Sequence, residues 1–323
     1  MLLFYKGDFM FTNTNSNKRY YTLDYYYKQK YNTKVFKVSL NIGCSCPNID
    51  GTKGYGGCIY CKNQSGDFAG DKKKPLKQQF TDVKNMMLKK WPKAKYIAYF
   101  QAGTNTYGNI NDLKKYYYEV LTYKDVVGIN IATRCDCINK EALEVLKDLN
   151  KKTDLTIELG LQSIHNKTLK LINCKYTKKD FLKTYKLLKK NNIKVVVHII
   201  NGLPYETKNM MIKTAKYLNK LNIDGIKIHM LHILKQTKLE KLYKDKNFHL
   251  LTKEEYVDIV VNELEYLNEN IVINRITGDP NIDDLIEPFW LVKKFTVLNE
   301  IDKEMKKRNI YQGDKIKRYQ LNK

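Results

Sequence analysis

The chain of 323 residues lacks any apolar run that approaches the roughly 20 residues of a membrane-spanning helix. It also lacks a signal-peptide pattern, because the apolar stretch MLLF at its start is too short and Asp8 follows soon after. No internal repeat, low-complexity tract or Pro/Gly-rich linker marks a domain boundary. With 43% apolar and 28% charged residues, we expect a globular, cytoplasmic protein that does not associate with a membrane.

Arginine is scarce: only five of the 58 basic residues are arginine, although the formal net charge is +24. A basic surplus favours a nucleic-acid partner, because cationic side chains replace the counterions of phosphates. An AT-rich coding bias, which would enrich lysine on any solvated surface, is the alternative explanation. Because arginine is scarce, Arg134 and Arg275 are candidates for a specific role. Both follow apolar runs, where lysine would have sufficed for a solvated charge.

Six apolar runs alternate with segments of helical periodicity, and this alternation predicts βαβ units with a parallel sheet. Six units fit an incomplete (β/α) barrel better than a closed barrel of eight units, and an open doubly wound sheet is the alternative. The predicted strands are 35–42, 96–101, 126–133, 155–162, 195–200 and 225–231. The predicted helices are roughly 76–91, 109–122, 139–150, 166–190 with a break, and 206–221.

We divide the chain into a leader that packs on the barrel (1–34), the barrel (35–235) and a mostly helical C-terminal extension (236–323) with a short apolar run at 272–274. Polar, glycine-bearing and cysteine-bearing segments follow the ends of the six predicted strands. Ligands bind at the carboxyl ends of strands in parallel α/β folds, so we expect these segments on one rim. They are Cys46, Gln101–Asn105, Thr133-Arg134, Gln162-Ser163, Asn201–Pro204 and His232.

Four of the seven cysteines lie in CSCPNIDGTKGYGGCIYC, which runs from Cys44 to Cys61. Cys46, Cys58 and Cys61 have the spacing C-x11-C-x2-C, and no second CxxC or His-x3–5-His pair is present to complete a usual zinc site. The glycine-dense loop between them can wrap closely around a bulky group. Three thiolates around an iron–sulfur cluster leave one iron open to a substrate. The pattern therefore favours a cluster over zinc, and zinc over a redox dithiol.

The sequence resembles the radical SAM superfamily, and within it the Elp3-like YhcC/YtqA group, from about residue 19 to residue 313. The segments that carry the resemblance are KVFKVSLNIGCSCPNIDGTKGYGGCIYC, GDFAG, YIAYFQAGTNTY, GINIATRCDC, IELGLQSIHNKTLKLIN, HIINGLPYET, DGIKIHMLHILKQTKL, RITGDP and IDKEMKKRNIYQG. The long gap between the first two cysteines departs from the usual C-x3-C-x2-C of the superfamily but matches this group. The resemblance implies a partial (β/α)6 TIM-like barrel of the radical SAM type with a helical C-terminal extension.

The resemblance also implies the cofactors. A [4Fe-4S] cluster would be held by Cys46, Cys58 and Cys61, and S-adenosylmethionine (SAM) would chelate the open iron. Reductive cleavage of SAM would give a 5′-deoxyadenosyl radical, with the electron supplied by a donor such as flavodoxin or ferredoxin. The residues that match the SAM-binding positions of the family are Tyr60, Gln101, Gly103, Thr104, Asn105, Arg134, Glu158, Gln162, Ser163, Gly202, Leu203 and Pro204.

Several of these residues have a plainer alternative role. Tyr60 could simply pack, the Gly202–Pro204 segment could simply turn the chain, and Glu158 could form a structural ion pair with Arg134. We expect His198, His229 and His232 to be satisfied rim or core histidines rather than substrate ligands. For Arg275 and Asp279 we expect a place at the cavity, with a loop-stabilising ion pair as the alternative. The cysteines that we expect not to bind the cluster are Cys44, Cys135, Cys137 and Cys174.

The group resembles the radical domain of Elp3, which acts on the wobble uridine of tRNA. The implied function is a tRNA-modifying radical SAM enzyme that converts 5-carboxymethylaminomethyluridine to 5-aminomethyluridine, and the positive charge suits a tRNA partner. No acetyltransferase-like extension is visible, so complete Elp3 chemistry is not expected. The alternatives are a radical SAM enzyme with a small-molecule or protein substrate and, more remotely, a zinc-containing nucleic-acid-binding protein.

Overall fold

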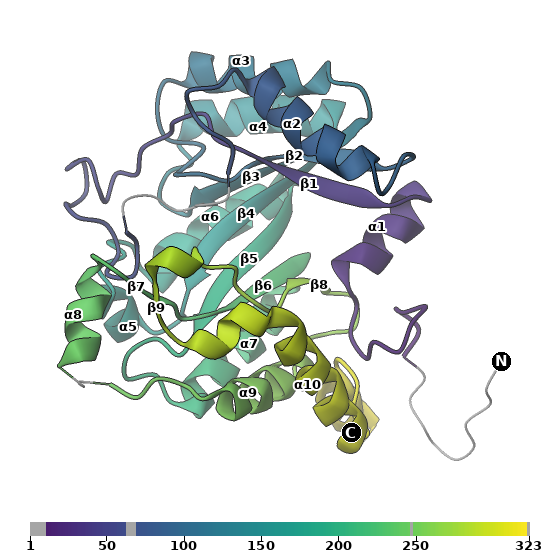
Figure 1. Ribbon diagram of the computed structural model, residues 1–323, viewed down its shortest axis with the longest axis vertical. Helices are drawn as coiled ribbons and strands as arrows, with labels where there is room; N and C mark the ends of the chain where they lie inside the picture. Colours follow the sequence, from purple (N-terminus) through teal and green to yellow (C-terminus); the bar gives the residue numbers. More distant parts are fainter. Residues whose placement is uncertain (1–10, 63–68, 246–247, 322–323) are drawn as a thin grey trace.

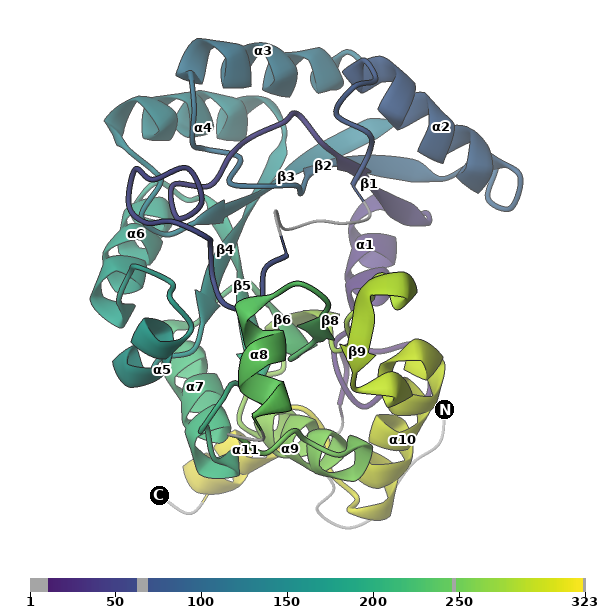
Figure 2. The same cartoon turned by 60° about the vertical axis from the view of Figure 1, so that its left-hand side comes forward.

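A computed structural model describes residues 11–62, 69–245 and 248–321. One parallel sheet of seven strands runs through it in the order β1-β2-β3-β4-β5-β6-β8 and curls into part of a barrel (Figure 1, Figure 2). Its strands are β1 (Val35–Leu40), β2 (Lys95–Phe100), β3 (Val126–Arg134), β4 (Asp154–Gln162), β5 (Lys194–Asn201), β6 (Gly225–Met230) and β8 (Val272–Arg275). The strand order follows the chain, which confirms the incomplete barrel and excludes the doubly wound sheet, whose order reverses at a switch point.

Helices between the strands cover the outer face of the sheet (Figure 2). They are α2 (Leu76–Leu88), α3 (Ile110–Leu121), α4 (Lys140–Lys152), α5 (Asn166–Leu171), α6 (Lys178–Lys190) and α7 (Lys208–Leu221), close to the predicted ranges. Local sequence fixes where several of them begin: Asn139, Thr177 and Thr207 accept hydrogen bonds from amides of the first turns of α4, α6 and α7. Such caps satisfy donors that have no partner within the helix.

The two faces of the sheet differ in polarity. In β3, Ile129 and Ile131 are fully buried and belong to the hydrophobic core, whereas Asn130 between them lies on the inner face. The same alternation in β4 buries Ile157 and Leu159 against the helices and points Glu158 into the barrel. The core therefore lies between the sheet and its helices, and the barrel interior is polar.

The leader and the C-terminal extension complete the barrel. Helix α1 (Leu23–Tyr31) lies between β1 and β8 (Figure 2), and Thr22 just before it pairs with Ile273 as a parallel bridge. The apolar run 272–274, which we assigned to a mostly helical extension, forms strand β8 and pairs with β6. The other elements of the extension are β7 (Ile233–Leu234), α8 (Lys238–Lys244), α9 (Lys253–Glu265), η1 (Ile282–Asp284), β9 (Leu285–Glu287), η2 (Phe289–Lys293), α10 (Lys294–Lys307) and α11 (Asp314–Leu321).

None of the helices in the described part of the chain is long and apolar enough to cross a membrane. The domain boundaries at residues 34 and 235 stay a prediction. Part of the motif GDFAG, at residues 66–68, lies outside the described residues.

Candidate active site

The cysteine loop leaves the carboxyl end of β1 and folds back on itself. The amide of Ile49 donates to the carbonyl of Cys46 (2.7 Å), and the amide of Cys61 donates to the carbonyl of Cys58 (3.0 Å). Between these turns Gly57 adopts a φ of +68°, where a Cβ atom would meet the side chain of Ile49 at 3.2 Å. A glycine is therefore required at this close approach.

The three cysteines of the C-x11-C-x2-C motif are free thiols, and each of them interacts with at least one of the others. Hydrogen bonds from Cys174 and Cys61 hold the pKa of Cys58 well below its usual range, whereas the bond to Cys58 raises the pKa of Cys61. The repulsion between Cys46 and Cys61 also acts on that thiol, which places Cys46 nearby. A thiolate is the form that binds metal, so Cys58 is prepared for ligation.

The donor set fits an iron–sulfur cluster better than zinc. Within residues 11–62, 69–245 and 248–321, no three His, Cys, Asp or Glu side chains are arranged to hold a single metal ion. A zinc ion needs four ligands at about 2.0–2.3 Å, which would draw the thiols tightly together. A multinuclear cluster needs thiolates only at its corners, so it suits more widely spaced thiols. That Cys46, Cys58 and Cys61 hold such a cluster stays a prediction. The buried Oδ1 of Asn48, whose Nδ2 lies 3.7 Å from the Cys58 sulfur, has no hydrogen-bond partner and adds an unused polar atom beside this group.

A second segment, between α5 and α6, also holds the cysteine loop, and no local pattern in the sequence predicts this contact. The sulfur of Cys174 lies 3.6 Å from that of Cys58 and is fully buried, so Cys174 belongs to the core. Asn173 donates to the carbonyl of Gly57 (2.7 Å), and Asn48 donates to the carbonyl of Asn173 (2.6 Å). The connection from α5 to α6 therefore fixes the position of the cysteine motif.

Arg134 supports this connection rather than Glu158. Its guanidinium forms a two-pronged ion pair with Asp136 (2.9 and 3.0 Å) and also donates to the carbonyl of Cys174 (2.8 Å). The predicted alternative, an ion pair between Arg134 and Glu158, is wrong. A planar guanidinium satisfies both acceptors at once, which a lysine could not do.

The other cysteines are separate from this group. Cys44 and Cys135 are buried among apolar side chains, and burial raises the pKa of Cys44 to about 12. Cys137 is half-buried beside Asp136. That these three do not bind the cluster stays a prediction.

The rim segments predicted from the sequence do meet at the carboxyl ends of the strands, but several are occupied by structural contacts. The Asn105 amide group donates to the carbonyls of Phe100 and Ala132 (both 3.1 Å), and the amide of Thr104 donates to the carbonyl of Ser45 (3.1 Å). These bonds tie the end of β2 to β3 and to the cysteine loop. Gln101 and Gly103 in the same segment are partly exposed.

The ends of β4 and β5 are also tightly built. Gln162 has a φ of +67°, which is uncommon for a residue with a side chain and marks a forced turn at the end of β4. Ser163 is fully buried and bonds Glu206. Leu203 and Pro204 are buried in the turn after β5. Contacts of all these residues with SAM stay a prediction, as do those of Gly202 and the SAM-binding role of Tyr60.

Tyr60 lies next to the cysteines. Burial and the charge of Cys58 raise its pKa well above the usual range, and its hydroxyl hydrogen-bonds Cys58. Its ring also packs against the hydrophobic core. Tyr60 therefore contacts both the Cys58 thiol and the core.

Glu158 lies in the middle of β4 and is the centre of a polar network inside the barrel. Its Oε1 accepts from Lys37 (2.7 Å) and Asn130 (2.8 Å), and its Oε2 contacts Lys227 and His198 (2.9 Å). Although burial alone would raise the pKa of Glu158, the charges of Lys227 and Lys37 hold it well below the usual range. The carboxylate is therefore ionised and already occupied by four partners.

One carboxylate cannot balance all the cations around it. Burial and the charge of Lys37 lower the pKa of Lys227 to about 7, against the opposing pull of Glu158. Burial and the charge of Lys227 lower the pKa of His198 to about 4, so its imidazole is neutral near pH 7. The network consequently carries a surplus of positive charge whenever Lys227 is protonated.

Two further histidines, His229 near the end of β6 and His232 just after it, form no hydrogen bond with the part of the chain that the structure describes. The ring of His229 stacks on that of His198, with centroids 5.7 Å apart. The Nε2 atoms of His229 and His232 are buried and have no partner among the described residues, so the expectation that they are satisfied is wrong. Burial lowers the pKa of His232 to about 4, and that of His229 well below its usual range. Both rings are therefore neutral, and the Nε2 atom of each is free to form a hydrogen bond with a ligand.

Arg275, the other scarce arginine, forms an ion pair with Asp279, which Lys294 also contacts (3.0 Å). The loop-stabilising alternative is thus confirmed. Its positive charge still lowers the pKa values of His229 and His232, so Arg275 lies close to the same space.

The comparisons with known proteins identify the family. A model of the radical SAM superfamily matches residues 51–218, and a model of the radical SAM C-terminal domain matches residues 223–307. The chain belongs to the radical SAM superfamily. The cofactors of this superfamily are a [4Fe-4S] cluster and SAM, as the resemblance implied.

Relatives place the chain within the superfamily. It is 45% identical to YtqA of Bacillus subtilis over 94% of each chain, and 29% identical to YhcC of Escherichia coli over 90% of this chain and 93% of that one. A tRNA uridine(34) acetyltransferase of Methanocaldococcus infernus is 27% identical over 57% of this chain and 34% of that protein.

Among solved structures, the Elp3 of Methanocaldococcus infernus superposes with a TM-score of 0.64 at 20% identity, covering 86% of this chain. The match spans 64% of that solved chain, which is therefore considerably longer than the part that they share. The shared part shows a common fold.

Proposed function

We propose that the protein is a tRNA-modifying radical SAM enzyme that converts 5-carboxymethylaminomethyl groups at the wobble uridine to 5-aminomethyl groups. The observation that carries the proposal is the joint occurrence of a three-cysteine motif and a cation-rich barrel interior in one member of the Elp3-like group. When bound, the cluster and SAM together supply a 5′-deoxyadenosyl radical, and a donor such as flavodoxin or ferredoxin supplies the electron.

Cys46, Cys58 and Cys61 would hold the cluster. The support is their common loop, the lowered pKa of Cys58 and the hydrogen bond between Tyr60 and Cys58. SAM would lie over the rim between Gln101 and Gln162, the partly exposed residues at the ends of β2 and β4. Glu158 is less suited to this role than the family pattern implies, because four protein groups already use its two oxygens.

The substrate substituent would enter the barrel above Glu158. A carboxymethylaminomethyl group ends in a carboxylate, and Lys227 with Lys37 offers more positive charge than Glu158 neutralises. An anionic group beside Lys227 would raise its pKa from about 7 and keep it protonated. The unpartnered nitrogens of His229 and His232 offer further hydrogen bonds to the substituent.

A tRNA partner is supported by the net charge of +24 and by the likeness to the uridine(34) acetyltransferase. The bases of an anticodon loop are unpaired, so one of them can reach a barrel mouth without the melting of a duplex.

Mass spectrometry of tRNA nucleosides tests the proposal. In cells that lack the gene, 5-carboxymethylaminomethyluridine should accumulate and 5-aminomethyluridine derivatives should disappear. The wild-type gene and a Cys44→Ala variant should restore the pattern, whereas Cys58→Ala should not. An unchanged nucleoside profile in the deletion strain would refute the tRNA substrate and leave a small-molecule or protein substrate.

A further inference from the structure

A cavity of about 750 Å³ lies at the end of the barrel opposite the cysteines. Its wall contains Asp154 and Lys194, which begin β4 and β5, and Asp224, which precedes β6. The cysteine loop follows the carboxyl end of β1, and all strands are parallel, so the two sites lie at opposite ends. A volume of this size is typical of small-ligand sites.

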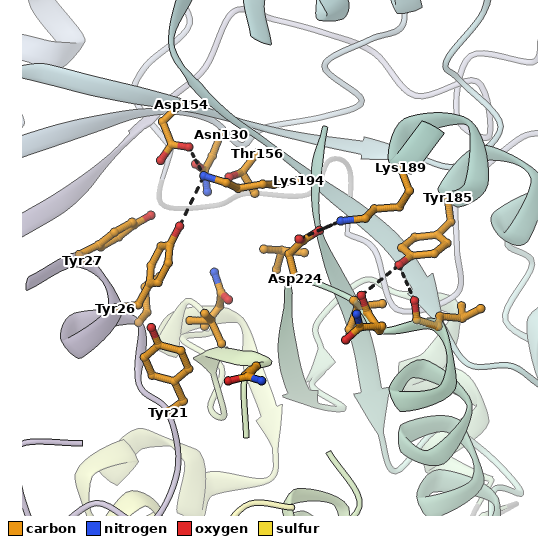
Figure 3. A pocket seen from close by; sticks show the side chains of 18 of the residues that line it. Tyr21, Tyr26, Tyr27, Asn130, Asp154, Thr156, Tyr185, Lys189, Lys194 and Asp224 are labelled. Atoms are coloured by element: carbon orange, nitrogen blue, oxygen red, sulfur yellow. Dashed lines mark hydrogen bonds and ion pairs between the residues drawn. The ribbon is translucent and has the colours of Figure 1, made fainter. Parts of the chain in front are cut away.

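The cavity has two distinct walls. Figure 3 shows Tyr26 and Tyr27 of α1 on one side, together with Tyr21, which precedes that helix. Tyr185 and Lys189 of α6 lie on the other side. Tyrosine rings offer flat surfaces on which a planar ring can stack without selecting one base.

Polar groups that lack protein partners face the same space. The Oδ1 of Asn274 is buried and unpartnered, and no hydrogen bond to its Nδ2 occurs within the described residues, so either orientation leaves the amide group unused. The hydroxyls of Tyr27 and Thr156 also line the cavity and have no hydrogen bond among the described residues. An unpartnered buried polar atom such as Asn274 Oδ1 is rare, and a ligand that donates and accepts hydrogen bonds would suit this amide and the two hydroxyls.

The lysines at the cavity fall into two classes. Lys189 is paired with Asp224 (2.7 Å), and Lys194 is paired with Asp154. Lys186 and Lys190, one helical turn apart on α6, are exposed and form no ion pair with the described residues. These two unpaired lysines lie beside a cavity that is lined by tyrosine rings and an amide group. Such an arrangement suits a phosphate attached to a planar base.

We propose that this cavity binds a nucleotide, with the base between the tyrosines and near Asn274, and the phosphate at Lys186 and Lys190. The nucleotide is either a free nucleoside monophosphate or an unpaired residue of an RNA chain. The proposal does not rest on the proposed function, because the cavity is remote from the cysteines and would bind a nucleotide whatever the enzyme modifies.

The test is calorimetric titration of the reconstituted full-length protein, with excess SAM present so that the cofactor site is filled. The probes are uridine and adenosine 5′-monophosphates, the two nucleosides without phosphate, and a short unstructured oligoribonucleotide. Lys186→Gln with Lys190→Gln should weaken nucleotide binding about 10-fold or more and leave nucleoside binding unchanged. Asn274→Ala should weaken both about 5-fold.

The matched control is Lys179→Gln with Lys183→Gln. These lysines have the same kind of spacing on the exposed side of α6 but do not line the cavity, so this variant should bind like wild type. Monophosphate binding without oligonucleotide binding identifies a free nucleotide as the ligand, and tighter oligonucleotide binding with the same variant pattern identifies RNA. The proposal is overturned if no probe binds at millimolar concentration, or if the control pair weakens binding as much as the cavity pair.

Discussion

Replacing Glu158 with glutamine removes the carboxylate that holds Lys37 and Lys227 inside the barrel and keeps the shape of the side chain. Breaking a buried ion pair by removing one partner costs about 3–5 kcal/mol, because the other charge stays buried without compensation. Lys227 limits this cost, since a pKa of about 7 lets it release its proton at pH 8. We therefore expect Glu158→Gln to lower the free energy of unfolding by about 3 kcal/mol at pH 8, the low end of that range.

The loss of unfolding free energy in Glu158→Gln should become smaller as the pH falls. The pKa of Glu158 is lower in the folded chain than in the unfolded chain, where it is about 4.3. Its carboxylate therefore stabilises the fold above that pH, and this stabilisation is lost as the pH falls through the folded-state pKa. Urea denaturation should show the full difference between wild type and Glu158→Gln at pH 8 and a shrinking difference below about pH 4.

A second variant tests whether Lys227 is buried in its neutral form at pH 8. Burying a lysine that is neutral at pH 8 costs about 1.4 kcal/mol for each unit between pH 8 and its unfolded pKa of about 10.4, or about 3 kcal/mol. Adding Lys227→Met to Glu158→Gln removes this cost, so the double variant should be more stable than the single one. Glu144→Gln, which breaks an exposed pair with Lys147, is the control and should change stability by less than about 0.5 kcal/mol. A loss below about 1 kcal/mol in Glu158→Gln, or no gain in the double variant, would refute the network.

Three other changes have defined outcomes. Cys58→Ala should reduce the iron content and the visible absorbance of the anaerobically reconstituted protein to background while Cys44→Ala keeps both; a cluster retained in the first or lost in the second would show the ligand assignment to be wrong. Lys227→Met should raise the pKa of His198 from about 4 by about 1–2 units, because it removes a positive charge that shares Glu158 Oε2 with the imidazole; an unmoved imidazole resonance in an NMR pH titration would contradict this. Gly225→Ala should destabilise the fold by about 1–3 kcal/mol in thermal denaturation, because its Cβ would lie 2.4 Å from Asn274 Oδ1 and 3.0 Å from the carbonyl of Val272; wild-type stability would speak against the close packing of β8 on β6.

The sequence was sufficient to predict the parallel barrel because its signals are local and strong. Each strand from β1 to β6 lies within a few residues of an apolar run, and each helix between them follows a periodic segment. The short run 272–274 was harder to assign, since three apolar residues can belong to any element. It becomes a strand because the edge of β6 is available for pairing, which is a tertiary effect that no local pattern reports.

Local sequence patterns predicted some residues of the site but not others. The cysteine motif and the rim segments are visible as unusual residues at the ends of apolar runs. Lys37, Asn130 and Lys227 were missed because we treated the runs as continuously apolar. A period of two was present in the sequence, with Asn130 between Ile129 and Ile131, and Lys227 between Ile226 and Ile228. Polar residues at every second position of a buried strand indicate a polar barrel interior.

Cys174 and Asn173 could not have been found in this way. Their contacts with Cys58 and Gly57 join segments more than 100 residues apart, and a single cysteine after a helix has no distinctive spacing. Arg134 was recognised as unusual, but its partner was misassigned. The guanidinium pairs with Asp136, two residues away, and with the carbonyl of Cys174, rather than with Glu158.

The most direct test of the central claim is the reaction of the reconstituted, reduced enzyme with SAM and tRNA from cells that lack the gene. We expect 5′-deoxyadenosine to form while 5-carboxymethylaminomethyluridine in that tRNA is converted to 5-aminomethyluridine. If 5′-deoxyadenosine forms but the nucleosides of the tRNA stay unchanged, the tRNA substrate is contradicted.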